Sequence, residues 1–148
     1  MDEKKLKILR ETGHYMTSPR GVSMYPMLRE KKDIVDIVPI SRPLKKYDVV
    51  IYYRPADNNC VIHRFFRHEN DCCIIYGDNC RQKEVIPRER VFGVVSRFYR
   101  NGKWISPDNK GYRLYVHLWC DFLPVRRAVF RVRDKLKRRK HNEKQKRT

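Results

Sequence analysis

Residues 91–105, VFGVVSRFYRNGKWI, decide the fold of this chain. Val, Phe and Tyr dominate the first nine positions, and β-branched and aromatic side chains favour strands. Asn101-Gly102 follows, a dipeptide that readily adopts the two positive φ values of a tight hairpin turn. The stretch therefore predicts a strand over 91–99, a two-residue turn and a return strand over 103–105.

Similar runs precede this hairpin. Short β-branched and aromatic stretches alternate with Pro, Asn, Asp and Lys, which are typical of turns and strand ends. We expect further strands at residues 15–17, 34–38, 48–53, 60–66 and 72–76. Closely spaced strands with turn signals between them favour a mainly β domain, an antiparallel barrel or sandwich.

The pattern divides the chain into three parts. Residues 1–15 form a lead-in with a short helix or an extended segment, and residues 16–107 carry the strands. After Pro107 the apolar residues change to helical spacing, so residues 108–148 are expected to form a basic amphipathic helical segment. Leu114, Tyr115, Leu118, Trp119 and Phe122 are expected to share one apolar face of it.

The sequence indicates a cytoplasmic protein. It shows no secretory leader at the N-terminus and no apolar stretch long enough to span a bilayer. The 5 cysteines have no Cys-x-x-Cys spacing, so we expect reduced thiols and no zinc site. Nothing in the sequence indicates a metal or a cofactor.

Positive charge is concentrated at the C-terminal end. The chain has a formal net charge of +18, and 12 Lys or Arg residues lie between Arg126 and Arg147 against Asp134 and Glu143. Such a segment is a solvated helix or arm, or a helix over residues 112–140 that lies on an anionic membrane from the cytoplasmic side. Nucleic acid is the least favoured partner, and the sequence says nothing of the oligomeric state.

Gly21-Val22-Ser23-Met24-Tyr25-Pro26-Met27-Leu28 presents a serine in a turn of Gly and Pro. A serine hydroxyl becomes a nucleophile only when a base takes its proton and donors receive the oxyanion. His63 lies in the apolar run VIHRFF, and Asp78 lies in the Gly77-Asp78-Asn79 turn after a predicted strand. Serine, histidine and aspartate can act as nucleophile, base and orienting carboxylate.

Five motifs occur together in one order. They are GVSMYPML (21–28), YDVVIY (47–52), VIHRF (61–65), GDN (77–79) and VFGVV (91–95). Together they resemble the S24/S26 serine peptidases, which include the type I signal peptidases and the LexA-like self-cleaving repressors, over residues 16–99. The resemblance implies a LexA-like or signal-peptidase-like β fold.

The resemblance also implies roles for particular residues. Ser23 corresponds to the nucleophile and His63 to the base, in the histidine-type branch, where most of the superfamily has lysine. Asp78 is the favoured third member, and Glu84, a second acid after the Gly-Asp-Asn segment, is the alternative. Gly21, Met24, Pro26, Arg64, Gly77 and Asn79 complete the motifs and turns.

The sequence departs from the family at several points. Tyr47 and Lys32 stand where these relatives usually have glycine, and Met27 stands where they usually have threonine. No transmembrane anchor is evident, and no DNA-binding helix-turn-helix precedes the core, so LexA-type repression is not expected.

Two functions fit these motifs. The first is a serine endopeptidase that cleaves an exposed peptide or a leader-like segment of a peptide or protein substrate. The second is a catalytically silent module that captures an extended peptide in the same groove by adding it to a strand edge.

Overall fold

The structure, a computed structural model, describes residues 3–122, 124–126 and 128–135. The chain forms two compact units, Met1–Tyr112 and Arg113–Thr148. Strands end at Ile105 and helix α2 begins at Lys110, close to the change of pattern that the sequence places after residue 107.

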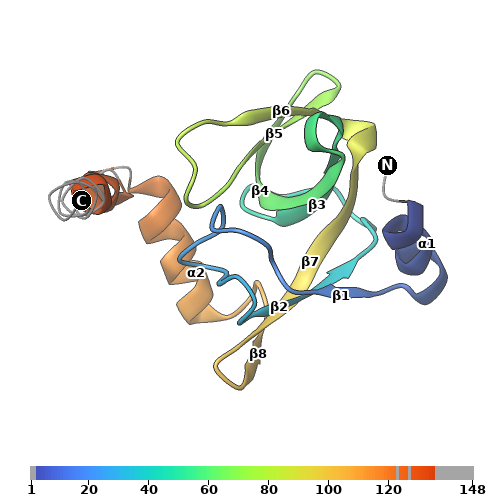
Figure 1. The fold of residues 1–148 in the computed structure, drawn as a ribbon, viewed down its shortest axis with the longest axis horizontal. Coiled ribbons are helices and arrows are strands. Elements are labelled where there is room, and N and C mark those ends of the chain that lie inside the picture. Colours follow the sequence, from blue (N-terminus) through green and yellow to red (C-terminus); the bar gives the residue numbers. More distant parts are fainter. Residues whose placement is uncertain (1–2, 123, 127, 136–148) are drawn as a thin grey trace, which may run out of the picture. The chain divides into compact units, whose positions relative to one another are not determined.

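The first unit is a curled antiparallel sheet, a half-barrel (Figure 1). Its strands follow the order β1-β2-β7-β3-β4-β5-β6, with β8 paired to β7. The mainly β class is confirmed, but the sheet remains open between β1 and β6. The strands are β1 (Tyr15–Thr17), β2 (Ile34–Val38), β3 (Val49–Arg54), β4 (Asn59–Glu69), β5 (Cys72–Tyr76), β6 (Glu84–Pro87), β7 (Val91–Arg100) and β8 (Lys103–Ile105).

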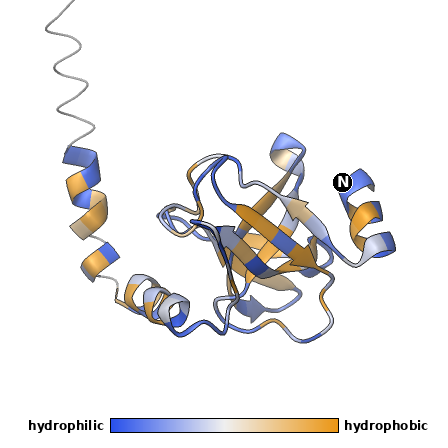
Figure 2. Cartoon of the chain, turned by 90° about the horizontal axis from the view of Figure 1, so that it is seen from below, coloured by the Kyte–Doolittle hydropathy of each residue, from blue (hydrophilic) through white to orange (hydrophobic). Residues whose placement is uncertain are grey.

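Buried apolar side chains of the strands form the core, and Figure 2 shows many hydrophobic positions along the strands. Val50 and Ile75 are fully buried, as is the phenol ring of Tyr52. The predicted turn at Asn101-Gly102 is confirmed, since both residues have positive φ, 51° and 78°. Two short 3-10 turns, η1 (Pro55–Asp57) and η2 (Arg88–Arg90), follow β3 and β6.

Helix α1 (Glu3–Thr12) precedes the sheet. Leu6 and Leu9 are buried, and Leu9 Cδ2 lies 3.2 Å from the point where a Cβ of Gly93 in β7 would stand. The helix ends at Thr12, and the N–H of the next residue, Gly13, donates to the Leu9 carbonyl with a φ of 73° at Gly13. This left-handed end is a common helix C-cap, and it directs the chain into β1.

Two strand edges are left open around one region of the unit. β4 pairs with β3 over Asn59–Arg64 but with β5 only from Arg64 onward. Within the part of the chain that the structure describes, residues 59–63 therefore have no strand on their second edge, and β1 pairs only with β2. Open edges of this kind can accept an added strand.

The second unit is helical. Helix α2 (Lys110–Val116) leads into it and continues as η3 (His117–Asp121), a π-helical turn, and residues 124–126 and 128–135 are also helical. Trp119 is buried and lies edge-on to the buried ring of Phe130, with centroids 6.4 Å apart.

The residues expected on one apolar face of this unit differ in burial. Leu114, Leu118 and Phe122 are exposed, whereas Trp119 is buried. Residues 123, 127 and 136–140 of the predicted surface helix lie outside the described residues. Among the residues described, no helix is long and apolar enough to cross a membrane.

Candidate active site

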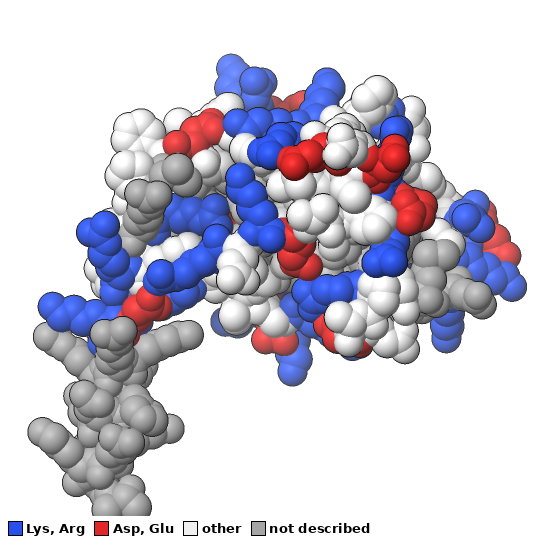
Figure 3. Space-filling view, turned by 90° about the horizontal axis from the view of Figure 1, so that it is seen from above, with Lys and Arg blue, Asp and Glu red and all other residues white. Residues whose placement is uncertain are grey.

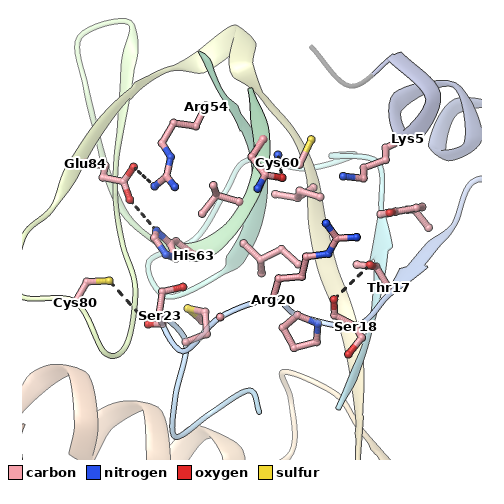
Figure 4. Close-up of a pocket in the computed structure, with 18 residues that line it drawn as sticks. Lys5, Thr17, Ser18, Arg20, Ser23, Arg54, Cys60, His63, Cys80 and Glu84 are labelled. Atoms are coloured by element: carbon pink, nitrogen blue, oxygen red, sulfur yellow. Dashed lines mark hydrogen bonds and ion pairs between the residues drawn. The ribbon is translucent and has the colours of Figure 1, made fainter. Parts of the chain in front are cut away.

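One pocket of the first unit brings the predicted serine and histidine together. It has a volume of about 280 Å³ and lies between the chain from β1 to Ser23 and the open edge of β4 (Figure 4). Ser23, His63 and Glu84 all line it, from a loop, from β4 and from the first position of β6.

His63 is held by one nitrogen of its ring. The side chain is only 3% exposed, and its Nδ1 lies 2.9 Å from Glu84 Oε1 and 3.0 Å from the Tyr52 hydroxyl. The other ring nitrogen, Nε2, is buried and has no hydrogen-bond partner among the described residues. An imidazole fixed at Nδ1 with Nε2 left open has the arrangement that a general base requires.

Burial and mutual contacts shift the pKa values of His63, Glu84 and Tyr52. Burial lowers the pKa of His63, but interactions with Cys80 and Glu84 outweigh burial, so the pKa is raised above its ordinary value. The hydrogen bond from His63 lowers the pKa of Glu84 to about 2, and Tyr52 and Arg54 contribute to the same shift. Burial, followed by the charge of Glu84, raises the pKa of Tyr52.

The lowered pKa of Glu84 keeps its carboxylate ionised near neutral pH. When the His63 ring is neutral, Nδ1 donates its proton to Glu84, which leaves the lone pair of the ring on Nε2. Tyr52 stays protonated, so its hydroxyl can donate to the same carboxylate. His63 therefore stands in a group of three hydrogen-bonding side chains, of which His63 and Tyr52 are buried and Glu84 is partly exposed.

The preference for Asp78 over Glu84 as the partner of His63 is corrected by these contacts. Asp78 follows β5 and is fully buried, and Arg64 grips both of its oxygens, with Nε–Oδ1 and Nη2–Oδ2 distances of 2.7 Å each. Glu84 is the carboxylate at Nδ1. A bidentate arginine pair fixes the position of the carboxylate it holds, so Asp78 serves the architecture of the turn.

Arg64 joins several parts of the unit. Its guanidinium is fully buried and also donates to the Tyr47 carbonyl at 3.0 Å, to the Tyr112 hydroxyl at 3.1 Å and to Met27 Sδ at 3.0 Å. The ion pair with Asp78 thereby ties β4 to the turn after β5 and to the loop that carries Ser23.

The turn after β5 holds the serine segment directly. The N–H of Asn79 donates to the Ser23 carbonyl at 2.7 Å, and its side-chain amide donates to the Val22 carbonyl at 2.9 Å. A Cβ on Gly77 would lie 2.6 Å from the Ser23 carbonyl oxygen and 3.0 Å from His63 Nε2. Only glycine permits this approach, so Gly77 and Asn79 place the serine segment beside the imidazole.

Ser23 itself is partly buried and lines the pocket. Its hydroxyl and His63 Nε2 are not hydrogen-bonded to each other, because Nε2 has no partner. Catalytic hydrogen bonds are often long in ligand-free enzymes and shorten when substrate binds. The arrangement brings the Ser23 hydroxyl and the His63 imidazole to one pocket without a hydrogen bond between them.

The remaining motif residues shape the loop. Met24 is buried at 3% exposure, and the Tyr25–Pro26 peptide bond is cis. Gly21 has a φ of 73°, in the region that favours glycine, with open space where a Cβ would stand. These residues set the path of the chain on both sides of Ser23.

Tyr52 and Cys80 are functional candidates that the motifs did not single out. Tyr52 lies opposite Val61 in the β3–β4 register, and Val50 lies opposite His63. Tyr52 and His63 are therefore diagonal neighbours on one face, which the register could have revealed. Cys80 follows the Gly77 turn, with its Sγ 2.7 Å from the point where a Cβ of Gly77 would stand.

The described residues show no metal-binding arrangement. Among the described residues, no group of His, Cys, Asp or Glu side chains is arranged to hold a metal ion. The pocket offers the Ser23 hydroxyl, the His63 imidazole, the Glu84 carboxylate and the Cys80 thiol. Comparison of the chain with models of known protein families and with curated proteins finds no match.

Proposed function

We propose that this chain is a serine endopeptidase, with Ser23 as nucleophile, His63 as general base and Glu84 as the carboxylate that orients the imidazole. The observation that carries the proposal is the asymmetry of the His63 ring. Nδ1 is held by Glu84 and Tyr52, and Nε2 is buried without a partner beside the serine segment. A merely structural histidine would satisfy both nitrogens, because an unmade buried hydrogen bond costs free energy.

The mechanism follows from these positions. Ser23 Oγ attacks the scissile carbonyl while His63 Nε2 accepts its proton, and the imidazolium then protonates the leaving amine. Glu84 stays ionised and stabilises the imidazolium. Water then attacks the acyl-serine, again with His63 as base. The backbone N–H of Ser23 is a candidate oxyanion donor.

The substrate would enter as an extended segment. The pocket lies beside residues 59–63 of β4, an edge without a second strand among the described residues. Adding a peptide to this edge satisfies backbone groups on both sides and presents a carbonyl to Ser23. The substrate class is therefore an exposed peptide or leader-like segment.

Active-residue variants test the proposal. The chain is incubated with a library of N-acetylated, C-amidated decapeptides, and cleavage is read by mass spectrometry. Wild type should cleave, whereas Ser23→Ala and His63→Ala should not. Ser41→Ala and His117→Ala, at exposed positions outside the pocket, are the matched controls and should cleave normally. Equal cleavage by wild type and Ser23→Ala would refute the assignment.

A peptide-binding module without turnover is the second candidate. The observation in its favour is that Ser23 and His63 are not hydrogen-bonded to each other. Under this alternative the open edge of β4 would still bind an extended peptide. Saturable peptide binding by wild type, without any cleavage over long incubation, would support it.

A further inference from the structure

The pocket extends beyond the serine and histidine to a cationic end. Arg20, which follows the buried Pro19, and Lys5 of α1 both line it. In Figure 4 the guanidinium of Arg20 and the ammonium of Lys5 point toward each other, near Cys60 of β4. Two cations that line one pocket form a position that favours an anion.

Charges at the catalytic end of the pocket are already paired. Arg54 binds Asp57, with an Nη2–Oδ2 distance of 2.6 Å, and Glu84, with an Nη1–Oε2 distance of 3.4 Å. Among the described residues that line the pocket, Glu84 is the single acidic one, and it already contacts His63 and Arg54. Arg20 has no carboxylate partner among the described residues, so its charge is not offset from within the pocket.

Both cations are attached to fixed parts of the fold. Leu6 and Leu9 are buried and anchor α1, and thereby fix the backbone position of Lys5. Arg20 lies between Pro19, which is buried, and Gly21 with its φ of 73°. Their backbones are therefore held in place by the folded unit, which lowers the loss of freedom when the two side chains bind a ligand.

We infer that Arg20, together with Lys5, forms a subsite for the carboxylate side chain of an Asp or Glu residue in the bound peptide. The inference rests on the proposed function of the groove as a peptide site. A peptide added along residues 59–63 of β4 presents alternate side chains to one face. One of these side chains would reach Arg20, whose planar guanidinium binds carboxylates through two parallel hydrogen bonds.

The surrounding field favours the same ligand. The chain has a net charge of +18, and the face in Figure 3 carries more Lys and Arg than Asp and Glu. Positive potential raises the association rate of acidic peptides in general. A true subsite differs from this general attraction because it acts at one position of the peptide, and the experiment exploits the difference.

The experiment uses the decapeptide library with the wild-type chain and with two neutralised variants. Arg20→Gln removes the proposed carboxylate ligand, and Lys103→Gln, exposed on β8 and outside the pocket, removes the same charge elsewhere. Wild type and Lys103→Gln should enrich Asp and Glu about tenfold at one fixed distance from the cleaved bond, a preference of the size that one charge-assisted hydrogen bond supplies. Arg20→Gln should lose the enrichment.

Binding to the Ser23→Ala chain separates this inference from the proposed function. Peptides retained by the Ser23→Ala chain are identified by sequencing. A control peptide has Gln in place of Glu and a free C-terminus, and it tests whether the terminal carboxylate is the group that binds. Retention of the peptide with internal Glu and an amidated end supports the side-chain subsite even if wild type cleaves nothing. Cleavage without positional enrichment, enrichment that survives Arg20→Gln, or retention of the free-terminus peptide alone overturns the subsite and leaves the peptidase assignment standing.

Discussion

Glu84 Oε1 lies 2.9 Å from Nδ1 of His63, and the strand that supplies Glu84 is β6, at one edge of the sheet. The carboxylate enters the pocket because β6 pairs with β5, where Glu84 stands opposite Ile75. The proposed catalytic group is thus assembled from three separate segments, and its pKa values depend on that assembly. Each can be tested alone.

Glu84→Gln should move the pH dependence of cleavage. The carboxylate raises the pKa of His63, so its removal lowers that pKa and lets the imidazole remain neutral to lower pH. The acid edge of kcat/KM should therefore shift to lower pH, while kcat falls because the ring loses its orienting partner. Profiles of kcat/KM against pH measure both effects, with exposed Glu89→Gln as control. An unmoved edge would exclude the role of Glu84.

Wild-type activity should rise with pH through a pKa above 6.5. The sequence alone predicts an edge at about 6.5, the ordinary histidine value. Cys80 and Glu84 together overcome burial and raise the pKa of His63, so the ring stays protonated, and inactive as a base, to a higher pH. A pH–rate profile on one peptide substrate measures the edge. An edge below 6.5 would show that burial dominates instead.

Strand pairing, which the sequence does not show, brings Glu84 to His63. The sequence predicted β2, β5 and β8 at their observed bounds, because each is a run of β-favouring residues between turn signals. It did not predict β6, Glu84–Pro87, a short edge strand that ends in proline and is defined by pairing with β5. Pairing is a tertiary property, so the motif order alone could not place Glu84 beside His63.

The sequence also predicts the backbone conformation of two turns only in part. Tyr47 stands where the resembling family usually has glycine, and its φ of 78° lies in the left-handed region that favours glycine. The turn therefore keeps the conformation and carries the cost of a side chain there. Lys31, not Lys32, has positive φ at the second departure, with a value of 57°.

Asp78→Asn should destabilise the fold, in contrast to the selective loss of turnover that a catalytic role would give. Removing one partner of a buried ion pair leaves the other charged and unpaired, and costs about 3–5 kcal/mol. Arg64 is fully buried and would be left in that state. Urea unfolding of the variant measures the loss, with exposed Asp71→Asn as control. Unchanged unfolding with abolished cleavage would restore Asp78 to the catalytic group.

Gly77→Ala should separate the serine segment from the imidazole. The added methyl would stand 2.6 Å from the Ser23 carbonyl and 2.7 Å from Cys80 Sγ, which is closer than atoms pack, so the segment must shift. A displacement of about 1 Å costs on the order of 100-fold in rate. Gly111→Ala is the control, because its nearest neighbour is the Asn109 side chain at 3.3 Å. Kinetics and far-UV circular dichroism would show whether turnover falls while the sheet is retained.

The last prediction concerns the exposed apolar side chains of the second unit. Leu114, Leu118 and Phe122 follow one another at helical spacing, and each is more than half exposed. Val125, Val129 and Val132 are also exposed, among Arg residues. Apolar side chains beside basic ones suit the headgroup region of an anionic bilayer, where each basic residue contributes about 1 kcal/mol of attraction.

We therefore expect the chain to sediment with anionic vesicles of phosphatidylglycerol and phosphatidylcholine, and not with phosphatidylcholine alone. High salt should weaken the binding, because it screens the charges. Leu118→Asp with Phe122→Asp should abolish the apolar part of the binding, and Lys103→Gln is the matched surface control on the first unit. Binding that survives the double substitution would be purely electrostatic. If the chain does not sediment with anionic vesicles at low salt, the membrane prediction is wrong, and the exposed apolar side chains serve a protein partner or none.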